Sequence, residues 1–121
     1  MGGQNPAIVL ADADLEAAAD AIVSGAMSFA GQKCTATRRV IVLEEVAKTM
    51  DRLLAERIEA LVVGDPARDG VTVGPLISPV AVEEFEQATS AALEAGGEVV
   101  ARAGSGEVGY FVSPVLIRQD D

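Results

Sequence analysis

Residues 29–43 read Phe-Ala-Gly-Gln-Lys-Cys-Thr-Ala-Thr-Arg-Arg-Val-Ile-Val-Leu. An alanine-rich pattern with helical spacing precedes this stretch, and its last four residues form an apolar run typical of a buried strand. The polar residues between these elements predict a loop. Cys34, the only cysteine of the chain, lies in that loop. The stretch therefore predicts a helix, a loop carrying a single thiol, and a buried strand.

Strand and helix patterns alternate along the remainder of the chain. We expect strands at 7–10, 40–43, 98–102 and 110–117, the last an edge or bulged strand because Pro114 interrupts it. We expect helices that start at Asp12, directly after the strand at 40–43, and at Ser78-Pro79, with the first ending at Gly31. The glycine-rich connection at 64–77 is too long for a simple linker and should be ordered. This order predicts the α/β class, a largely parallel sheet with flanking helices in one domain of residues 1–121.

Composition excludes several classes of function. The 121 residues carry a net charge of −10, so the chain should repel nucleic acid and anionic membrane surfaces. It has no histidine and one cysteine, which excludes an internal disulfide, a Cys-His pair and a multi-thiolate metal site; we expect no metal. A lone cysteine and an N-terminus unlike a signal peptide fit a cytoplasmic protein.

Other motifs carry little chemistry. Gly2-Gly3 and Gly104-Ser105-Gly106 lack the spacing of phosphate-binding loops and are interpreted as turns. Arg38-Arg39 has two interpretations, an anion clamp or a structural pair leading into the strand, and the second is favoured. The Glu83, Glu84 and Glu86 cluster lies in a first helical turn, where the helix dipole accounts for it.

Cys34 remains as the chemical candidate, with two interpretations. A lone cysteine often serves as a small buried hydrophobic residue. Its neighbours Gly31, Gln32, Lys33 and Thr35 make a poor core segment, however, and reactive groups tend to lie on loops held by rigid elements. The residues alone leave both interpretations open.

Several motifs together resemble one known family. The run 31–36, Gly-Gln-Lys-Cys-Thr-Ala, followed by Arg39 and an apolar strand, resembles the nucleophile segment of the NAD(P)-dependent aldehyde dehydrogenase superfamily. Residues 2–6, Gly-Gly-Gln-Asn-Pro, resemble that family's Gly-Gly-Lys-Asn-Pro segment, with Gln4 replacing the usual lysine. Further matches follow in family order, at 12–15, 64–66, 74–77 and 109–114. The resemblance thus covers nearly the whole chain, and residues 32–37 are most similar to semialdehyde dehydrogenases.

The resemblance implies a mechanism. The Cys34 thiolate attacks an aldehyde to give a thiohemiacetal, hydride passes to NAD or NADP, and water hydrolyses the resulting thioester to a carboxylic acid. The backbone N–H of Cys34 would form half of an oxyanion hole. Gly31 and Gln32 would shape the loop around the nucleophile.

The resemblance also implies what lies outside this sequence. The family's general-base glutamate precedes the position of Gly2 by two residues, and the cofactor-binding and oligomerisation segments have no counterpart here. We therefore expect a nucleophile-bearing piece of the catalytic domain, with no aldehyde oxidation or tight cofactor binding of its own. The intact enzyme would be a homo-oligomer, and apolar surface left uncovered would favour self-association of the chain. The alternative is a non-catalytic α/β interaction or assembly module in which Cys34 is a packing residue.

Overall fold

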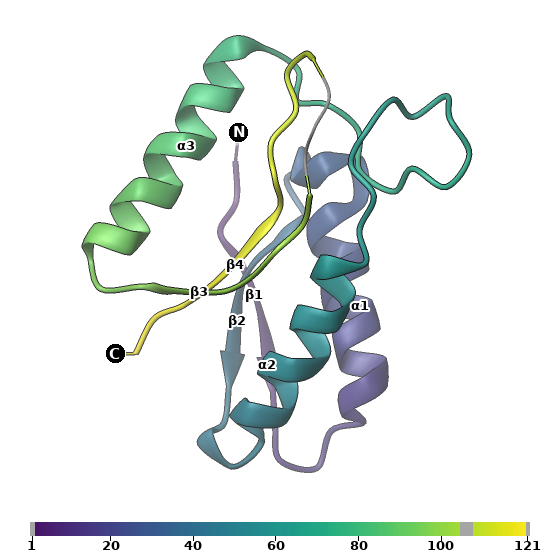
Figure 1. Cartoon of the computed structure of the whole chain (residues 1–121). Coiled ribbons are helices and arrows are strands. Elements are labelled where there is room, and N and C mark those ends of the chain that lie inside the picture. The colour runs from purple at the N-terminus through teal and green to yellow at the C-terminus, as the bar shows by residue number, and fades with distance from the viewer. Residues whose placement is uncertain (1, 105–107, 121) are drawn as a thin grey trace.

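The computed structural model describes residues 2–104 and 108–120. It has eight elements in chain order (Figure 1): β1 (Asn5–Val9), α1 (Leu15–Met27), the 3-10 turn η1 (Ser28–Gly31), β2 (Thr37–Val42), α2 (Glu44–Glu59), α3 (Pro79–Glu94), β3 (Glu98–Arg102) and β4 (Val115–Arg118). The α/β class is therefore confirmed. Most of the turn predicted at Gly104-Ser105-Gly106 lies outside the described residues.

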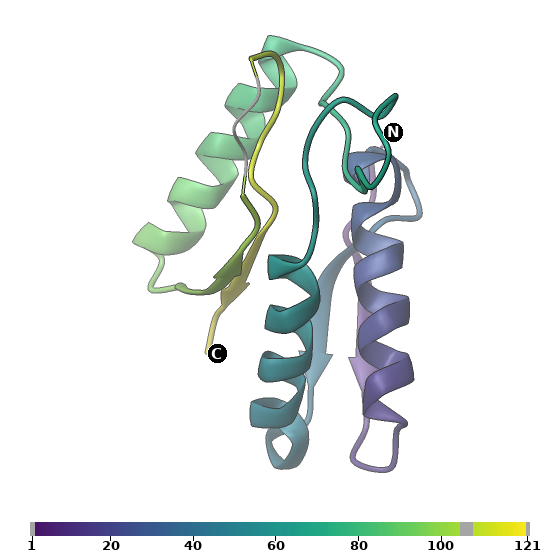
Figure 2. The same ribbon diagram turned by 45° about the vertical axis from the view of Figure 1, so that its right-hand side comes forward.

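The first half of the chain forms a strand–helix–strand unit. β1 pairs with β2 in parallel, with Ile8 opposite Ile41 and Val9 opposite Val42, and α1 makes the crossover between the two strands. Helices α1 and α2 lie side by side over one face of this pair (Figure 2). α1 approaches β2 closely, since a Cβ atom at Gly25 would lie 3.0 Å from the Thr37 hydroxyl oxygen. Gly25 thus permits the close packing of α1 against β2.

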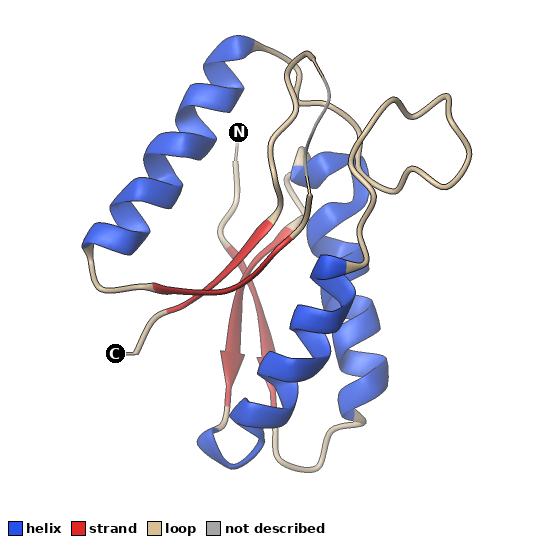
Figure 3. Ribbon diagram, viewed as in Figure 1, coloured by secondary structure: helices blue, strands red, loops and turns tan. Residues whose placement is uncertain are grey.

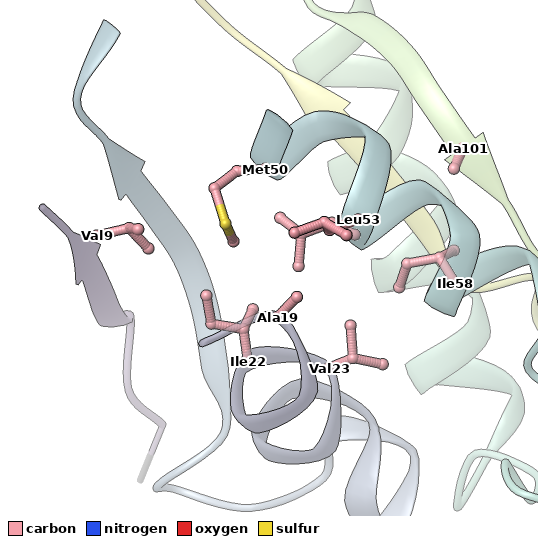
Figure 4. Close-up of a cluster of buried hydrophobic side chains, with 9 residues drawn as sticks. Val9, Ala19, Ile22, Val23, Met50, Leu53, Ile58 and Ala101 are labelled. Carbon is pink, nitrogen blue, oxygen red and sulfur yellow. The ribbon is translucent and has the colours of Figure 1, made fainter. Parts of the chain in front are cut away.

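The hydrophobic core lies between these helices and the strands (Figure 4). Met50 and Leu53 of α2 are its largest fully buried side chains. The other buried members of the core come from β1, α1, α2 and β3: Val9, Ala19, Ile22, Val23, Leu54, Ile58 and Ala101. Every member is aliphatic or Met, because the chain has few aromatic residues with which to fill a core.

An ionic contact at the edge of the core also joins α1 to α2. The Arg57 guanidinium of α2 donates hydrogen bonds to the carboxylates of Asp20 and Glu16 in α1, the second at 2.7 Å. The hydrogen bond to Asp20, and to a smaller extent that to Glu16, raises the pKa of Arg57 above its ordinary value. Arg57 therefore remains charged, and the two helices are tied at their polar surface as well as in the core.

The second strand pair departs from the predicted largely parallel sheet. β3 and β4 are antiparallel and form a separate two-stranded sheet (Figure 3). The reason is the connection between them, which contains no helix among its described residues, whereas parallel strands require a long crossover that is usually helical. β4 begins directly after Pro114, and the register shifts between Val99 and Ala101. The irregularity thus lies on β3 and not at Pro114, and the predicted strand at 110–117 forms only from Val115, as an edge strand of the two-stranded sheet. Of the two strand pairs among the described residues, β1–β2 is the parallel one.

Helix starts were predicted with mixed success. Ser78 caps α3 through a hydrogen bond from the Ala81 N–H, with Pro79 in the first turn, as predicted. α1 starts two residues later than predicted, because the Asp14 carboxylate, and not that of Asp12, accepts the N–H of Ala17. Within the described residues, no helix is both long and apolar enough to span a membrane.

The connection at 64–77 is ordered, as predicted. The Gly64 N–H donates to the Val73 carbonyl at 3.0 Å, and the Thr72 N–H donates to the Val62 carbonyl at 2.9 Å. Further along this segment, the Leu76 N–H donates to the Tyr110 carbonyl near the C-terminus of the chain at 2.7 Å. Pro75 and Ile77 reach the loop that carries Cys34 through hydrogen bonds with the Gln32 side chain.

Much apolar surface is not covered within this chain. Ile8 and Ile41 are 65% and 49% exposed, on the face of the β1–β2 pair opposite the helices. Helix α3 contains no buried residue. Between α3, α1 and α2 lies a cleft of about 390 Å³, lined mainly by apolar side chains that include Phe85 and Leu54. The hydrophobic core therefore covers one face of the β1–β2 pair and leaves the other face exposed.

Leu53→Ala should show how far stability depends on the α1–α2 core. Leu53 is 2% exposed, and truncating a buried leucine to alanine costs roughly 2–5 kcal/mol of unfolding free energy. Leu93→Ala in α3, where the leucine is 38% exposed, is the matched control and should cost less than about 1 kcal/mol. Urea unfolding followed by circular dichroism measures both variants. Equal losses would contradict this location of the core.

Candidate active site

The helix before the Cys34 loop ends in an unusual reversal. α1 stops at Met27, four residues before the predicted end at Gly31, and η1 follows. Phe29, Ala30 and Gly31 all have left-handed backbone conformations, with φ of 55°, 53° and 70°. Two consecutive non-glycine residues at positive φ are costly, and such conformations cluster at functional sites. The left-handed residues are the physical reason that the helix cannot continue to Gly31.

Cys34 lies in the turn that follows η1. The Ala36 N–H closes this turn by donating to the Lys33 carbonyl at 3.1 Å. Cys34 is exposed, whereas Ala36 is 1% exposed and anchors the turn to the interior. The alternative in which Cys34 is a packing residue is thus wrong for this chain. Among the described residues the Cys34 N–H has no hydrogen-bond partner, so it can donate to an oxygen of a substrate.

Asn5, which begins β1, holds this turn from one side. Its side-chain nitrogen donates to the Cys34 carbonyl at 2.6 Å and to the Ala36 carbonyl at 3.1 Å. Gly3 also approaches the turn, since a Cβ atom built on Gly3 would lie 2.7 Å from the Cys34 carbonyl oxygen. Only glycine allows the chain to pass this close. Residues 3–5 therefore pack directly against the backbone of the nucleophile candidate.

Gln32 holds the loop from the other side. Its side-chain nitrogen donates to the carbonyls of Phe29 at 3.1 Å and Pro75 at 3.3 Å, and its side-chain oxygen accepts the Ile77 N–H at 2.9 Å. The amide of Gln32 thus joins η1 to residues 75–77. This network supports the loop-shaping role expected of Gln32, which stays a prediction together with that of Gly31.

Arg38 and Arg39 bind the protein's own backbone. Arg38 donates to the Gly31 carbonyl at 3.4 Å, and Arg39 donates to the Gln4 carbonyl at 3.1 Å. These contacts agree with the structural interpretation of the pair, favoured over an anion clamp. Lys33 extends over the Phe29 ring, with its ammonium nitrogen 5.3 Å from the ring centroid.

Reasoning from the residues did not find the role of Asn5. Twenty-nine residues separate it from Cys34, and no local spacing links the two. The sequence offered one signal, the resemblance of residues 2–6 to a family motif. That resemblance did not indicate which residues Asn5 would contact. The contact arises because parallel pairing places the start of β1 beside the start of β2.

Gln32→Leu tests the connection between the loop and residues 75–77. Leucine has a similar size but leaves the Ile77 N–H without its acceptor, so the loss should be about 1–2 kcal/mol of unfolding free energy. Hydrogen exchange at the Ile77 amide should also accelerate about fivefold or more. Gln87→Leu, at an exposed position of α3, is the control and should change neither quantity. An unchanged Ile77 amide in Gln32→Leu would argue against this bridge.

Comparison with known proteins identifies the family. The model of the aldehyde dehydrogenase family matches residues 1–121. The chain is 39% identical over 122 residues to the alpha-ketoglutaric semialdehyde dehydrogenase of Bacillus subtilis (strain 168), covering 96% of this chain and 25% of that protein. It therefore spans about a quarter of the length of the curated relatives it matches.

Solved structures agree with this result. Lactaldehyde dehydrogenase from Escherichia coli superposes with a TM-score of 0.89 at 37% identity, over 97% of this chain and 25% of that one. The NADP-dependent glyceraldehyde-3-phosphate dehydrogenase from Bacillus halodurans C-125, complexed with NADP, gives a TM-score of 0.87 at 39% identity, over 97% and 24%. The predicted resemblance, including the likeness to semialdehyde dehydrogenases, is confirmed. The chain belongs to the aldehyde dehydrogenase family.

Proposed function

We propose that this chain supplies the cysteine nucleophile of an NAD(P)-dependent aldehyde dehydrogenase that oxidises a small aldehyde, with semialdehydes as the candidate class, to a carboxylic acid. The observation that carries the proposal is an exposed thiol, Cys34, on a turn held by hydrogen bonds from both sides. Membership of the aldehyde dehydrogenase family supports aldehyde oxidation as the reaction in which this thiol takes part. The relative named as a semialdehyde dehydrogenase supports the substrate class.

The chemistry follows from the geometry of the turn. The Cys34 thiolate attacks the carbonyl carbon, so that a C–S bond forms and the π electrons move to the oxygen. The Cys34 N–H, which has no hydrogen-bond partner within the described part of the chain, donates to that oxyanion. NAD or NADP, bound elsewhere in the enzyme, would supply a hydride acceptor for this carbon, and a thioester would then remain on Cys34. Attack by water then breaks the C–S bond, releases the acid and restores the thiol.

The glycine segment beside Cys34 does not fit the phosphates of a dinucleotide. Gly3 packs against the Cys34 carbonyl and so does not line an open anion cradle. We therefore assign no cofactor-binding residue to this chain and propose that NAD or NADP binds elsewhere in the enzyme. The NADP complex of the Bacillus halodurans relative supports a nicotinamide cofactor for the family.

Several expectations about the enzyme remain proposals. A single cysteine and a charge of −10 support a cytoplasmic protein without nucleic-acid or membrane partners. A homo-oligomeric parent and self-association of this chain are also proposed. The exposed face of the β1–β2 pair, which includes Ile8 and Ile41, supports the second of these. A non-catalytic module is disfavoured because Cys34 does not pack in the interior.

Acylation by an activated ester tests Cys34 directly. With p-nitrophenyl acetate, the thiolate displaces p-nitrophenolate and retains the acetyl group, so the chain should gain one acetyl group at Cys34 by mass spectrometry. Cys34→Ser should lose about 100-fold or more in rate, because an unactivated hydroxyl is a far weaker nucleophile than a thiolate. Thr35→Ser, at the neighbouring exposed position, is the control and should react as the wild type does.

The same preparation tests whether the chain acts alone. Incubated with an aldehyde and NAD or NADP, it should produce no reduced cofactor. Production of NADH would refute the proposal that cofactor binding lies elsewhere. Equal acylation rates for the wild type and Cys34→Ser would refute the nucleophile assignment itself.

A further inference from the structure

The Asn5 side chain uses its whole donor capacity on the loop of Cys34. A primary amide has two N–H donors, and the Asn5 nitrogen lies 2.6 Å from the Cys34 carbonyl oxygen and 3.1 Å from that of Ala36. Both acceptors belong to one turn, and both are backbone groups, so the contact does not depend on the side chains of the loop. One amide thus binds two points on either side of Thr35.

Asn5 is itself firmly placed. It is the first residue of β1, and it pairs with Thr37 at the start of β2. After a register shift between Asn5 and Pro6, β1 continues the parallel ladder into the core, where Val9 is 3% exposed. The amide therefore connects the exposed turn to a strand with a buried end.

Holding the Cys34 carbonyl restricts the reactive group. The carbonyl carbon is bonded to the same Cα atom that carries the thiol, so fixing this carbonyl restricts rotation of the backbone at Cys34. The direction of the Cα–Cβ bond, which carries the thiol, then depends on the Asn5 contact. A near-attack geometry requires such restriction, because small displacements of a reacting group cost large factors in rate.

We propose that Asn5 is a positioning residue for Cys34, acting as a two-pronged donor that fixes the turn from which the thiol reacts. The proposal rests on the proposed function in one respect: positioning matters for a reaction only if Cys34 is the nucleophile. We call the two hydrogen bonds from the Asn5 amide to the Cys34 and Ala36 carbonyls the Asn5 clamp. Whether this clamp holds the turn can be tested separately from the reaction.

Two variants separate hydrogen bonding from shape. Asn5→Leu has nearly the size of asparagine but no donor. Asn5→Asp has the same shape, but presents carboxylate oxygens to the two carbonyl oxygens and so repels them. Hydrogen exchange of the Ala36 amide, which closes the turn, should accelerate about tenfold in Asn5→Leu and further in Asn5→Asp.

Two controls account for lost stability. Gln119→Leu removes an amide that donates to the Ala92 carbonyl at 3.3 Å, far along the chain from the Cys34 turn. Ile58→Val lowers the global stability from within the core. Both should leave exchange at Ala36 within twofold of the wild type under conditions where the chain is folded.

A spectroscopic readout reports on the clamp in the wild type. Asn5 is the only asparagine and Cys34 the only cysteine, so ¹⁵N-asparagine labelling gives one side-chain amide pair and iodoacetamide alkylates one site. Both amide hydrogens should exchange slowly, and their resonances should shift when Cys34 is alkylated. This measurement decides the question even if the Asn5 variants do not fold, because free, rapidly exchanging amide hydrogens would overturn the proposal.

The outcomes distinguish this inference from the proposed function. Ala36 exchange in both Asn5 variants equal to that in Gln119→Leu would overturn the clamp. A confirmed clamp with no ester acylation at Cys34 would leave Asn5 as a holder of the turn, and the nucleophile assignment would fail. If Asn5→Leu loosens the turn while its acylation rate stays within twofold of the wild type, the clamp exists but does not position the thiol, and the proposal is wrong.

Discussion

The parallel pairing of β1 with β2 is the constraint on which the other features depend. Parallel neighbours need a crossover, and α1 supplies it, so one helix is placed over the sheet and its C-terminal end is brought to the start of β2. The same pairing places Asn5 beside Thr37 and hence beside the turn of Cys34. A different register would separate the Asn5 amide from the carbonyls it binds.

The turn of Cys34 combines exposure with restraint. Its thiol faces solvent, yet its backbone is bound by Asn5 on one side, and the preceding Gln32 is bound to residues 75–77 on the other. The left-handed residues Phe29 and Ala30 add a local cost that the surrounding hydrogen bonds must offset. Restraint of this kind suits a nucleophile, because a group that is already oriented loses less freedom when it reacts.

The two faces of the β1–β2 pair differ in how far their apolar side chains are buried. The large aliphatic side chains of α2 face α1 and the inner side of the β1–β2 pair, while Ile8 and Ile41 extend from the outer side without cover. α3 buries no residue and borders an apolar cleft of about 390 Å³. The chain thus has a core on the inner side of the β1–β2 pair and exposed apolar surface on the outer side.

Features that depend on neighbouring residues could be predicted from the amino-acid sequence. The cap and proline at Ser78-Pro79 start a helix because their hydroxyl and fixed φ act within one turn. Cys34 could be placed in a loop because its polar neighbours lie between a helical pattern and an apolar run. Its chemistry came from several linked family motifs, since a lone cysteine is ambiguous.

Features that join distant segments became visible in the folded structure alone. The antiparallel pairing of β3 with β4 depends on the path of the segment that connects them, and the spacing of apolar residues does not predict that path. The choice of Asp14 over Asp12 as the helix cap depends on the turn that precedes it. The contact of Asn5 with Cys34 spans 29 residues and exists only once two strands have paired. Local patterns encode elements and candidate groups, but pairing in space determines which of those groups meet.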